Sequence, residues 1–134
     1  MSQGFENTFN SCADLTTIES GVFPQTTTVT SLAYTFSNCT ALKSLPADLF
    51  APLSGAKCKF TGTFKGCTAL EQLPEGLFAQ NSVATQFTET FSDCAALKSV
   101  PATLLGTNEK ISTVKSMFQG CSSLTQIPEQ RSEE

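Results

Sequence analysis

Five cysteines at nearly constant spacing constrain this chain more than any other feature of its sequence. They are Cys12, Cys39, Cys67, Cys94 and Cys121. Successive members lie 27, 28, 27 and 27 residues apart in a chain of 134 residues. Such a period is the sequence signature of repeat proteins, which stack copies of one supersecondary unit. The sequence therefore predicts five copies of a unit of about 27 residues.

Apolar residues recur at fixed distances from each cysteine. Phenylalanine lies three residues before it, and leucine three residues after it, in all five copies. An aliphatic residue lies six after it, and proline follows in every copy except the first, which has Glu19. All eleven phenylalanines fall into three columns, at seven and three residues before the cysteine and eleven after it. One unit cannot offset a backbone ordering entropy of roughly 1–2 kcal/mol per residue, so the copies are predicted to share a continuous core.

The segment before each cysteine has a helical pattern. Its apolar columns lie ten, seven and three residues before the cysteine, and spacings of three and four residues are those of one helix face. We therefore expect a short helix there, with Asn81–Ser82 and Thr107–Asn108 as N-caps. The helix should end at the residue before the cysteine, a position rich in Gly, Asn and Asp, which tolerate the left-handed conformation. These residues are Ser11, Asn38, Gly66, Asp93 and Gly120.

The segment after each cysteine, Leu-x-x-Leu-Pro, should be extended. The residue before a proline is biased toward the β or polyproline region, and proline lacks the amide hydrogen that a sheet ladder needs, so strands of two or three residues are expected. The single insertion lies within residues 51–59, where a loop should bulge without breaking the stack. The predicted architecture is an α/β repeat solenoid of five coils, each a short strand plus a short helix, in one domain over residues 1–134.

Units such as residues 35–46, Thr-Phe-Ser-Asn-Cys-Thr-Ala-Leu-Lys-Ser-Leu-Pro, resemble the bacterial surface-protein class of leucine-rich repeat, often called BspA-like. That class repeats Phe-x-x-Cys-x-x-Leu-x-x-Ile and forms curved solenoids. The resemblance covers residues 5–130 and implies a leucine-rich-repeat-like fold, a secreted or cell-surface location, and a role in adhesion or host contact. Two features depart from the class: the unit is longer than in its shortest members, and the last copy ends soon after Pro128 without a polar capping element. Residues 1–5 show no signal-peptide pattern.

Composition argues against catalysis, cofactors and metal ions. The sequence has no histidine, which removes the commonest general base and the usual partner of serine and cysteine nucleophiles. Its cysteines lie a full repeat apart, rather than the two to four residues typical of zinc ligands, and its carboxylates form no acid–base pair. A net charge of −4 disfavours nucleic acid, and no apolar run reaches the ~20 residues that span a bilayer. We therefore expect a protein that is not an enzyme.

The cysteine column has two interpretations. Its members are expected to be small buried residues with reduced thiols. Disulfides between neighbouring coils are the alternative, because the Cα atoms would lie ~5 Å apart, within bridging range. Against them, side chains in one column point the same way rather than toward each other. A second column, of Thr8, Thr35, Thr63 and Thr90, is expected to bond the preceding helical turn through its hydroxyls.

Binding specificity in a repeat protein resides in its exposed columns. The residues four and five after each cysteine vary in charge and are expected to form one strip on the strand face, here called the strand-face strip. After Thr16 and Thr17 in the first copy, it comprises Lys43, Ser44, Glu71, Gln72, Lys98, Ser99, Thr125 and Gln126. Extended surfaces of this kind are how solenoids bind. The strip predicts a binding module for a protein or glycan ligand; the alternative is that it is only soluble surface.

Two further hypotheses concern the whole chain. It could instead be a structural spacer in a longer adhesin or phage fibre. Terminal coils bury one of their two sides, so Phe5, Phe9 and Leu15 at one end, and Phe118 and Leu124 at the other, are expected to expose apolar surface. This surface predicts end-to-end self-association, or excision of the chain from a longer repeat array.

Overall fold

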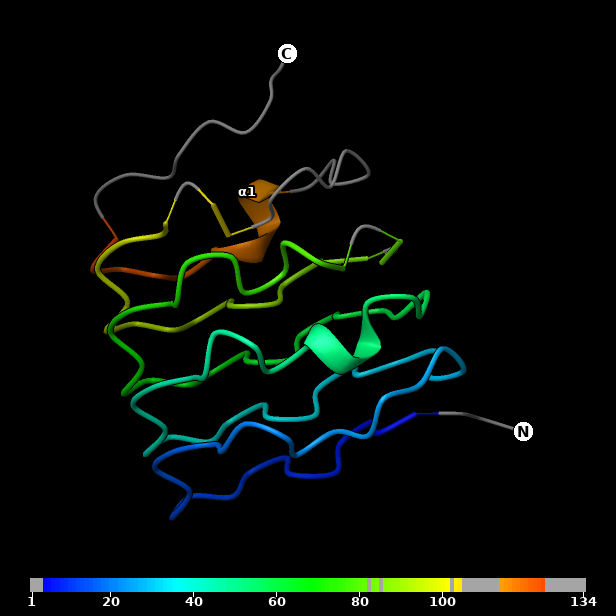
Figure 1. Cartoon of the computed structure of the whole chain (residues 1–134). Helices are drawn as coiled ribbons and strands as arrows, with labels where there is room; N and C mark the ends of the chain where they lie inside the picture. Colours follow the sequence, from blue (N-terminus) through cyan, green and yellow to red (C-terminus); the bar gives the residue numbers. More distant parts are fainter. Residues whose placement is uncertain (1–3, 82, 85, 102, 105–113, 125–134) are drawn as a thin grey trace.

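The computed structural model describes residues 4–81, 83–84, 86–101, 103–104 and 114–124. These residues form a stack of coils that follow one another in chain order (Figure 1). We name the coils first to fifth after Cys12, Cys39, Cys67, Cys94 and Cys121. Within the described ranges, regular helix is confined to two short elements: η1, a 3-10 helix at Ala51–Leu53, and α1, an α-helix at Val114–Met117. Most backbone hydrogen bonds therefore lie in turns and between coils.

A ladder of backbone hydrogen bonds connects successive coils in the segment before each cysteine. It begins with parallel bridges at Gly4–Ser31, Ser31–Lys59 and Lys59–Gln86. Beyond the bridge, alternate residues of one coil donate their amides to carbonyls of the next coil. In the first coil these donors are Phe5, Asn7, Phe9 and Ser11, with nitrogen–oxygen distances between 2.7 and 3.1 Å. Each coil is thus fixed to its neighbour through every second residue of this segment.

The helix expected before each cysteine is wrong for the first four coils. Two columns there, five residues and one residue before the cysteine, have φ near +60°, as at Asn7 (60°) and Ser11 (65°). An α-helix needs consecutive right-handed residues, so two left-handed residues four positions apart interrupt it. The fifth coil does contain a helix, α1, but it ends at Met117, four residues before Cys121 rather than next to it.

Consecutive turns replace the helix because they leave amides free for the neighbouring coil. The amide of Thr8 bonds the carbonyl of Phe5 over 3.1 Å, and the amide of Cys12 bonds that of Phe9 over 3.2 Å. A positive φ at the third residue of such a turn is what the type II geometry requires. In a helix every interior amide would be used within its own segment. The spacing of three and four residues between apolar columns therefore arises from turns that repeat every four residues.

The prediction of a left-handed residue directly before each cysteine is confirmed, with φ between 61° at Asn38 and 83° at Gly120. The N-cap assigned to Asn81 is wrong. Its side chain is buried, and its amide group donates to the carbonyls of Phe50 and Leu53 over 3.1 and 3.4 Å. The Asn81 side chain thus connects its segment to the preceding coil by hydrogen bonds instead of beginning a helix. The other expected cap residues, Ser82, Thr107 and Asn108, lie outside the described residues.

Phenylalanine rings form the centre of the core. In the column three residues before the cysteine the rings are stacked: Phe36 and Phe64 have centroids 5.4 Å apart and planes 5° apart. Rings of the other two columns pack beside this stack, and Phe50 meets Phe60 edge-on with centroids 4.9 Å apart. Stacked and edge-to-face pairs are both favoured by the aromatic quadrupole. The leucine column is buried as well in the second to fourth coils, which confirms the predicted shared core.

The threonine column also joins the coils. Thr35, Thr63 and Thr90 are fully buried. The hydroxyl oxygen of Thr63 lies 2.9 Å from the carbonyl oxygen of Phe60 in its own coil and 2.9 Å from that of Leu32 in the preceding coil. The local bond was expected, although the segment is a turn rather than a helix. The bond between coils gives the column a second role, because it satisfies a buried carbonyl across the coil boundary.

The insertion is accommodated without a break in the stack, as expected. Element η1 lies within it, and Leu53, Ala56 and Cys58 turn inward and are buried. The intercoil ladder resumes at the end of this segment, where the amide of Leu32 donates to the carbonyl of Lys59 over 2.8 Å.

The strands of two or three residues expected after each cysteine are wrong for the described residues. A single parallel bridge, Thr17–Ser44, joins the first and second coils there. Pro46 follows two residues later and has no amide hydrogen that could extend the ladder. The same is true of Pro74 and Pro101 in the next two coils. Pairing on this face is therefore reduced to isolated contacts.

The two ends of the stack differ. In the first coil Phe5, Phe9 and Leu15 are partly exposed, and Val22 is 41% exposed. A groove of about 320 Å³ opens beside Phe9 and Leu15. At the other end Phe118 is only 5% exposed, so the expected exposure of that ring is wrong. Its coil contains α1, which immediately precedes it, so this end is built differently from the first coil.

Candidate functional site

The strand-face strip lies on the surface wherever it is described. All six of its residues in the second to fourth coils are exposed; they are Lys43, Ser44, Glu71, Gln72, Lys98 and Ser99. Thr16 and Thr17 of the first coil are exposed too. Thr125 and Gln126, the predicted members from the fifth copy, lie outside the described residues. Each pair of strip residues lies between two apolar residues, such as Leu42 and Leu45, or Leu70 and Leu73, which are buried in the core.

Four strip residues line one groove of about 670 Å³. Lys43 and Ser44 come from the second coil, and Glu71 and Gln72 from the third. The rest of its lining is largely apolar and spans the second to fourth coils; these residues are Leu45, Thr68, Ala69, Leu73, Pro74 and Ala96. The structure therefore brings the central part of the strip together into a hollow with a polar rim, here called the strand-face groove.

The intercoil backbone hydrogen bonds of the strand-face groove are interrupted at one position. The amide of Lys43 donates to the carbonyl of Thr16 over 2.9 Å, and the amide of Lys98 donates to that of Glu71 over 3.0 Å. The equivalent bond, from Glu71 to Lys43, is missing among the described residues. The insertion at residues 51–59 separates these two coils. The Glu71 amide and the Lys43 carbonyl, both from residues that line the groove, are therefore not paired with each other.

Charges along the strand-face strip alternate in sign: Lys43 and Glu71 line the groove, and Lys98 lies beside Glu71 in the next coil. The Lys98 ammonium lies 3.5 Å from a carboxylate oxygen of Glu71, with both side chains more than half exposed (67% and 59%). An exposed pair of this kind contributes about 0–1 kcal/mol to stability and is easily rearranged. Lys43 forms no ion pair within the described part of the chain. The rim therefore offers a cation at Lys43 and an exchangeable pair beside it.

Most thiols of the chain are buried and protonated. All six cysteines are free thiols; Cys12 is partly exposed and the other five are buried. Burial raises the pKa of Cys58 to about 11 and that of Cys67 to about 12, so these thiols stay protonated near neutral pH. A nucleophilic or metal-binding cysteine needs the opposite shift. No cluster of metal-ligating side chains occurs among the described residues.

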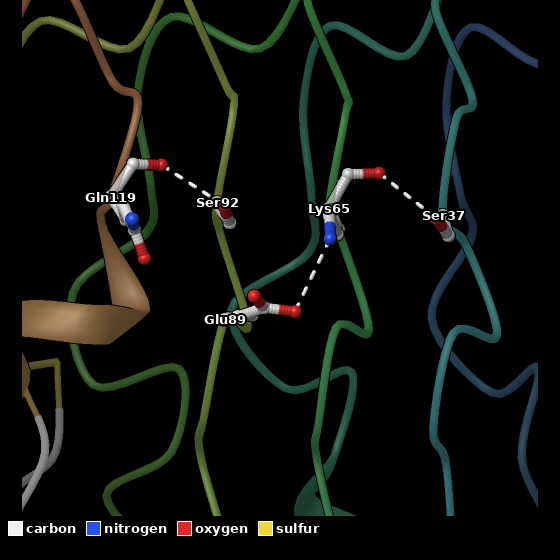
Figure 2. A network of polar contacts seen from close by, with 5 residues as sticks. All are labelled: Ser37, Lys65, Glu89, Ser92 and Gln119. Carbon is white, nitrogen blue, oxygen red and sulfur yellow. Dashed lines mark hydrogen bonds and ion pairs between the residues drawn. The ribbon is translucent and has the colours of Figure 1, made fainter.

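A separate polar surface lies on the turns before the cysteines, and sequence reasoning did not predict it (Figure 2). The Lys65 ammonium contacts a carboxylate oxygen of Glu89 at 3.2 Å, with each side chain about one-third exposed (35% and 34%). This hydrogen bond is the main cause of the raised pKa of Lys65. Around it, the hydroxyls of Ser37 and Ser92 donate to the carbonyls of Lys65 and Gln119 over 3.1 and 3.0 Å.

The sequence did contain an indication of this surface. The residue five before the cysteine is Asn7, Tyr34, Gly62 or Glu89 in the first four copies, which is too polar and too varied for a core column. A helical interpretation of the segment places these residues on a generic outer face. Only the left-handed turns show that they project next to the intercoil ladder.

Comparison with known proteins identifies one related structure. The crystal structure of a leucine-rich cell surface protein from Faecalibacterium prausnitzii A2-165 superposes with a TM-score of 0.60 at 21% sequence identity. The match covers 97% of this chain and 30% of that protein, so the present chain spans under a third of its length. The likeness shows a leucine-rich-repeat-like fold. No protein-family model and no curated protein matches the sequence.

Among the described residues, no helix has the length and apolar character required to cross a bilayer.

Proposed function

We propose that this chain is a non-catalytic binding module of a bacterial cell-surface or secreted protein, and that it holds a protein or glycan ligand in the strand-face groove. One observation carries the proposal: the groove of about 670 Å³ coincides with strip residues of the second and third coils. The location draws support from the structural neighbour, which is a leucine-rich cell surface protein.

The chemistry of the groove suits recognition. Apolar side chains such as Leu45, Leu73 and Ala69 line it, while Lys43 and Glu71 stand at its rim. Binding sites commonly combine an apolar lining with a few placed polar groups that fix orientation. The amide of Glu71 and the carbonyl of Lys43, which are not paired with each other, add a donor and an acceptor whose positions are set by the backbone. Such groups discriminate among ligands because a mismatched ligand leaves them unpaired.

A structural spacer is the second candidate function, and the ring stack favours it. Phe9, Phe36, Phe64 and Phe91 repeat with centroid separations of 5.3 and 5.4 Å and planes within 5° of one another. Together with the intercoil ladder, this regular column resists bending. A stiff stack suits a spacer that holds another domain away from a surface in an adhesin or phage fibre.

Binding assays separate the two candidates. The isolated chain would be screened against glycan arrays and host-surface proteins, alongside the triple variant Lys43→Ala, Glu71→Ala and Lys98→Ala. A matched control, Glu6→Ala, Lys57→Ala and Lys59→Ala, makes the same change in charge at exposed positions away from the groove. The binding module predicts saturable binding that the control retains and the triple variant loses by at least about tenfold, or 1.4 kcal/mol. Binding that is equal in both variants excludes the groove, and no binding to any ligand favours the spacer.

A further inference from the structure

Tyr34 is unlike every other aromatic residue of this chain. It is the only tyrosine, the chain has no tryptophan, and all eleven phenylalanines belong to the three core columns. Tyr34 instead lies on the turn surface, partly exposed, with a left-handed φ of 58°. A non-glycine residue rarely adopts this conformation, and the cost is higher for a bulky side chain. The intercoil bond from the Tyr34 amide to the carbonyl of Thr61, over 3.0 Å, stabilises it there.

Two glycines of the third coil give the Tyr34 ring and a neighbouring amide group room to lie across that coil. A Cβ atom on Gly62 would collide with the Tyr34 ring, whose Cδ1 and Cζ would be 2.6 and 3.0 Å away. A Cβ atom on Gly66 would likewise collide with the side-chain oxygen of Asn38. The ring and the amide group of the second coil therefore occupy the space that side chains would fill in the third coil. We call the surface formed by Tyr34 over Gly62 and Asn38 over Gly66 the Tyr34 shelf.

Polar groups border the Tyr34 shelf. Lys65 lies between the two glycines in sequence, and its ammonium is paired with Glu89 at 3.2 Å (Figure 2). The Asp93 carboxylate and, when ionised, the Tyr34 phenolate also raise the pKa of Lys65, by less than Glu89 does. Within the described residues, the Tyr34 hydroxyl has no hydrogen-bond partner. The shelf thus combines an aromatic ring with an amide, an ammonium and a carboxylate.

We propose that the Tyr34 shelf binds a neutral pyranose ring of a glycan. The negative face of an aromatic ring attracts the polarised C–H bonds on the apolar face of a sugar. The Asn38 amide and the Lys65–Glu89 pair offer both donors and acceptors for the hydroxyls at the edge of that sugar. A cationic ligand is disfavoured by Lys65, and a polyanion by Glu89, Asp93 and the net charge of −4. This site is separate from the strand-face groove and does not depend on it.

The composition of the chain provides a direct assay, because Tyr34 is its only tyrosine and there is no tryptophan to mask it. Tyrosine emission would be followed while methyl β-D-galactopyranoside, N-acetylglucosamine or cellobiose is added. At least one pyranoside should change the emission saturably, with a Kd of about 1 mM or below, and should protect the ring from quenching by iodide. An acyclic polyol, sorbitol, should do neither. Unchanged emission with all three sugars, while iodide still quenches the ring, overturns the proposal.

Variants test whether the ring itself is responsible, with ligand-observed NMR as a readout that does not need tyrosine. Tyr34→Phe keeps the platform and should bind within about threefold of the parent, whereas Tyr34→Ala should bind at least about tenfold more weakly. Because the ring also covers Gly62, a melt of Tyr34→Ala verifies that it is folded. If it is not, Asn38→Ala, which leaves the ring in place, should still weaken binding several-fold. Full binding by a folded Tyr34→Ala variant, or capture of a proline-rich peptide in place of every sugar, contradicts the proposal. Loss of binding only in the strand-face triple variant contradicts it too.

Discussion

The thiol of Cys67 donates a hydrogen bond to the backbone carbonyl of Phe36 in the preceding coil, over 3.2 Å. The same carbonyl accepts the amide of Cys39 over 3.3 Å. The thiols of Cys39, Cys94 and Cys121 donate equivalent hydrogen bonds over 3.1, 3.1 and 3.0 Å. In each case the acceptor is the phenylalanine carbonyl of the preceding coil. A thiolate cannot donate, and a disulfide sulfur has no hydrogen, so this contact between coils requires the reduced, protonated thiol.

Native thiol labelling should distinguish one cysteine from the other five. Cys12 is partly exposed, whereas Cys39, Cys58, Cys67, Cys94 and Cys121 are buried. Alkylation under native conditions, counted by mass spectrometry, should therefore label Cys12 first, and denaturation without reductant should then expose all six thiols. Rapid native labelling of all six would show that the column is open. Fewer than six thiols in the denatured protein would instead reveal disulfides.

The free energy of unfolding should fall steeply at alkaline pH. Burial raises the pKa of Cys67 from 9.0 to about 12 and that of Cys58 from 9.0 to about 11. Above pH 9 the unfolded thiols lose their protons while the folded ones keep them, so the unfolded state gains stability. This contribution is complete below pH 9 and is lost as pH rises toward 11–12, at most about 1.4 kcal/mol per pH unit for each thiol.

Urea unfolding at several pH values between 8 and 11, under reductant, measures this dependence. Cys58→Ala removes one such thiol without touching the cysteine column, so its stability should fall less steeply with pH than that of the parent. A free energy of unfolding that stays constant through this range would contradict the burial of these thiols.

Gly66→Ala should destabilise the chain more than Gly76→Ala, although both glycines belong to the third coil and have positive φ (78° and 70°). Each substitution incurs the left-handed cost of roughly 1–2 kcal/mol. At Gly76 the added methyl would meet only Ala79 at an ordinary 3.7 Å, whereas at Gly66 it would collide with Asn38. At Gly66 the exposed Asn38 side chain must also turn away, which adds a cost smaller than the roughly 1–3 kcal/mol of overpacking in a closed core.

A double-mutant cycle identifies the cause of that difference. Asn38→Gly removes the colliding side chain and tolerates a positive φ, so in the Gly66→Ala background it should recover part of the lost free energy of unfolding. Chemical denaturation of the four proteins gives the interaction energy. Strictly additive losses would mean that Asn38 and Gly66 do not contact each other.

The sequence was sufficient to predict the repeat, the apolar columns and the left-handed position before each cysteine. Those features depend on residue type at a fixed period, as with Gly66 and Asn38, and one sequence displays them five times. The helix was predicted wrongly because apolar spacings of three and four residues arise equally from turns that repeat every four residues. Tyr34 and Glu89, which have no intrinsic left-handed preference, both adopt positive φ, and the amide of Tyr34 is held there by its intercoil bond to Thr61. That tertiary cause cannot be seen within one unit.

The candidate sites likewise include features that the sequence predicts and features that depend on contacts between coils. Lys43, Glu71 and Lys98 occupy a column that is polar and varied in every copy, next to a column of buried leucines, so the strip could be predicted from the repeat. The strand-face groove could not, because its lining comes from three successive coils whose packing is not visible within one copy. The Tyr34 shelf depends on contacts between one coil and the next, Tyr34 over Gly62 and Asn38 over Gly66. Column alignment places the members of each pair in neighbouring copies, but it does not show that the larger side chain lies over the glycine.

The same substitution should cost more in the middle of the stack than at its first coil. Phe64 is fully buried and stacks on both sides, against Phe36 and Phe91 with centroids 5.4 Å away in each case. Phe9 is partly exposed and stacks on one side only, against Phe36 at 5.3 Å. Phe64→Ala should therefore cost roughly 3–5 kcal/mol, as in a closed core, and Phe9→Ala clearly less.

Phe118 tests the other end of the stack. It has one stacking neighbour among the described residues, Phe91 at 5.6 Å, yet it is only 5% exposed. Phe118→Ala should thus fall between the other two variants. Denaturant melts at several protein concentrations measure all three, and a midpoint that rises with concentration reports the end-to-end association expected from the exposed apolar surface around Phe9 and Val22. That rise should shrink in Phe9→Ala but persist in Phe64→Ala, provided the latter still folds. Equal losses in the three variants, with no dependence on concentration, would mean that the first coil is as closed as the middle of the stack.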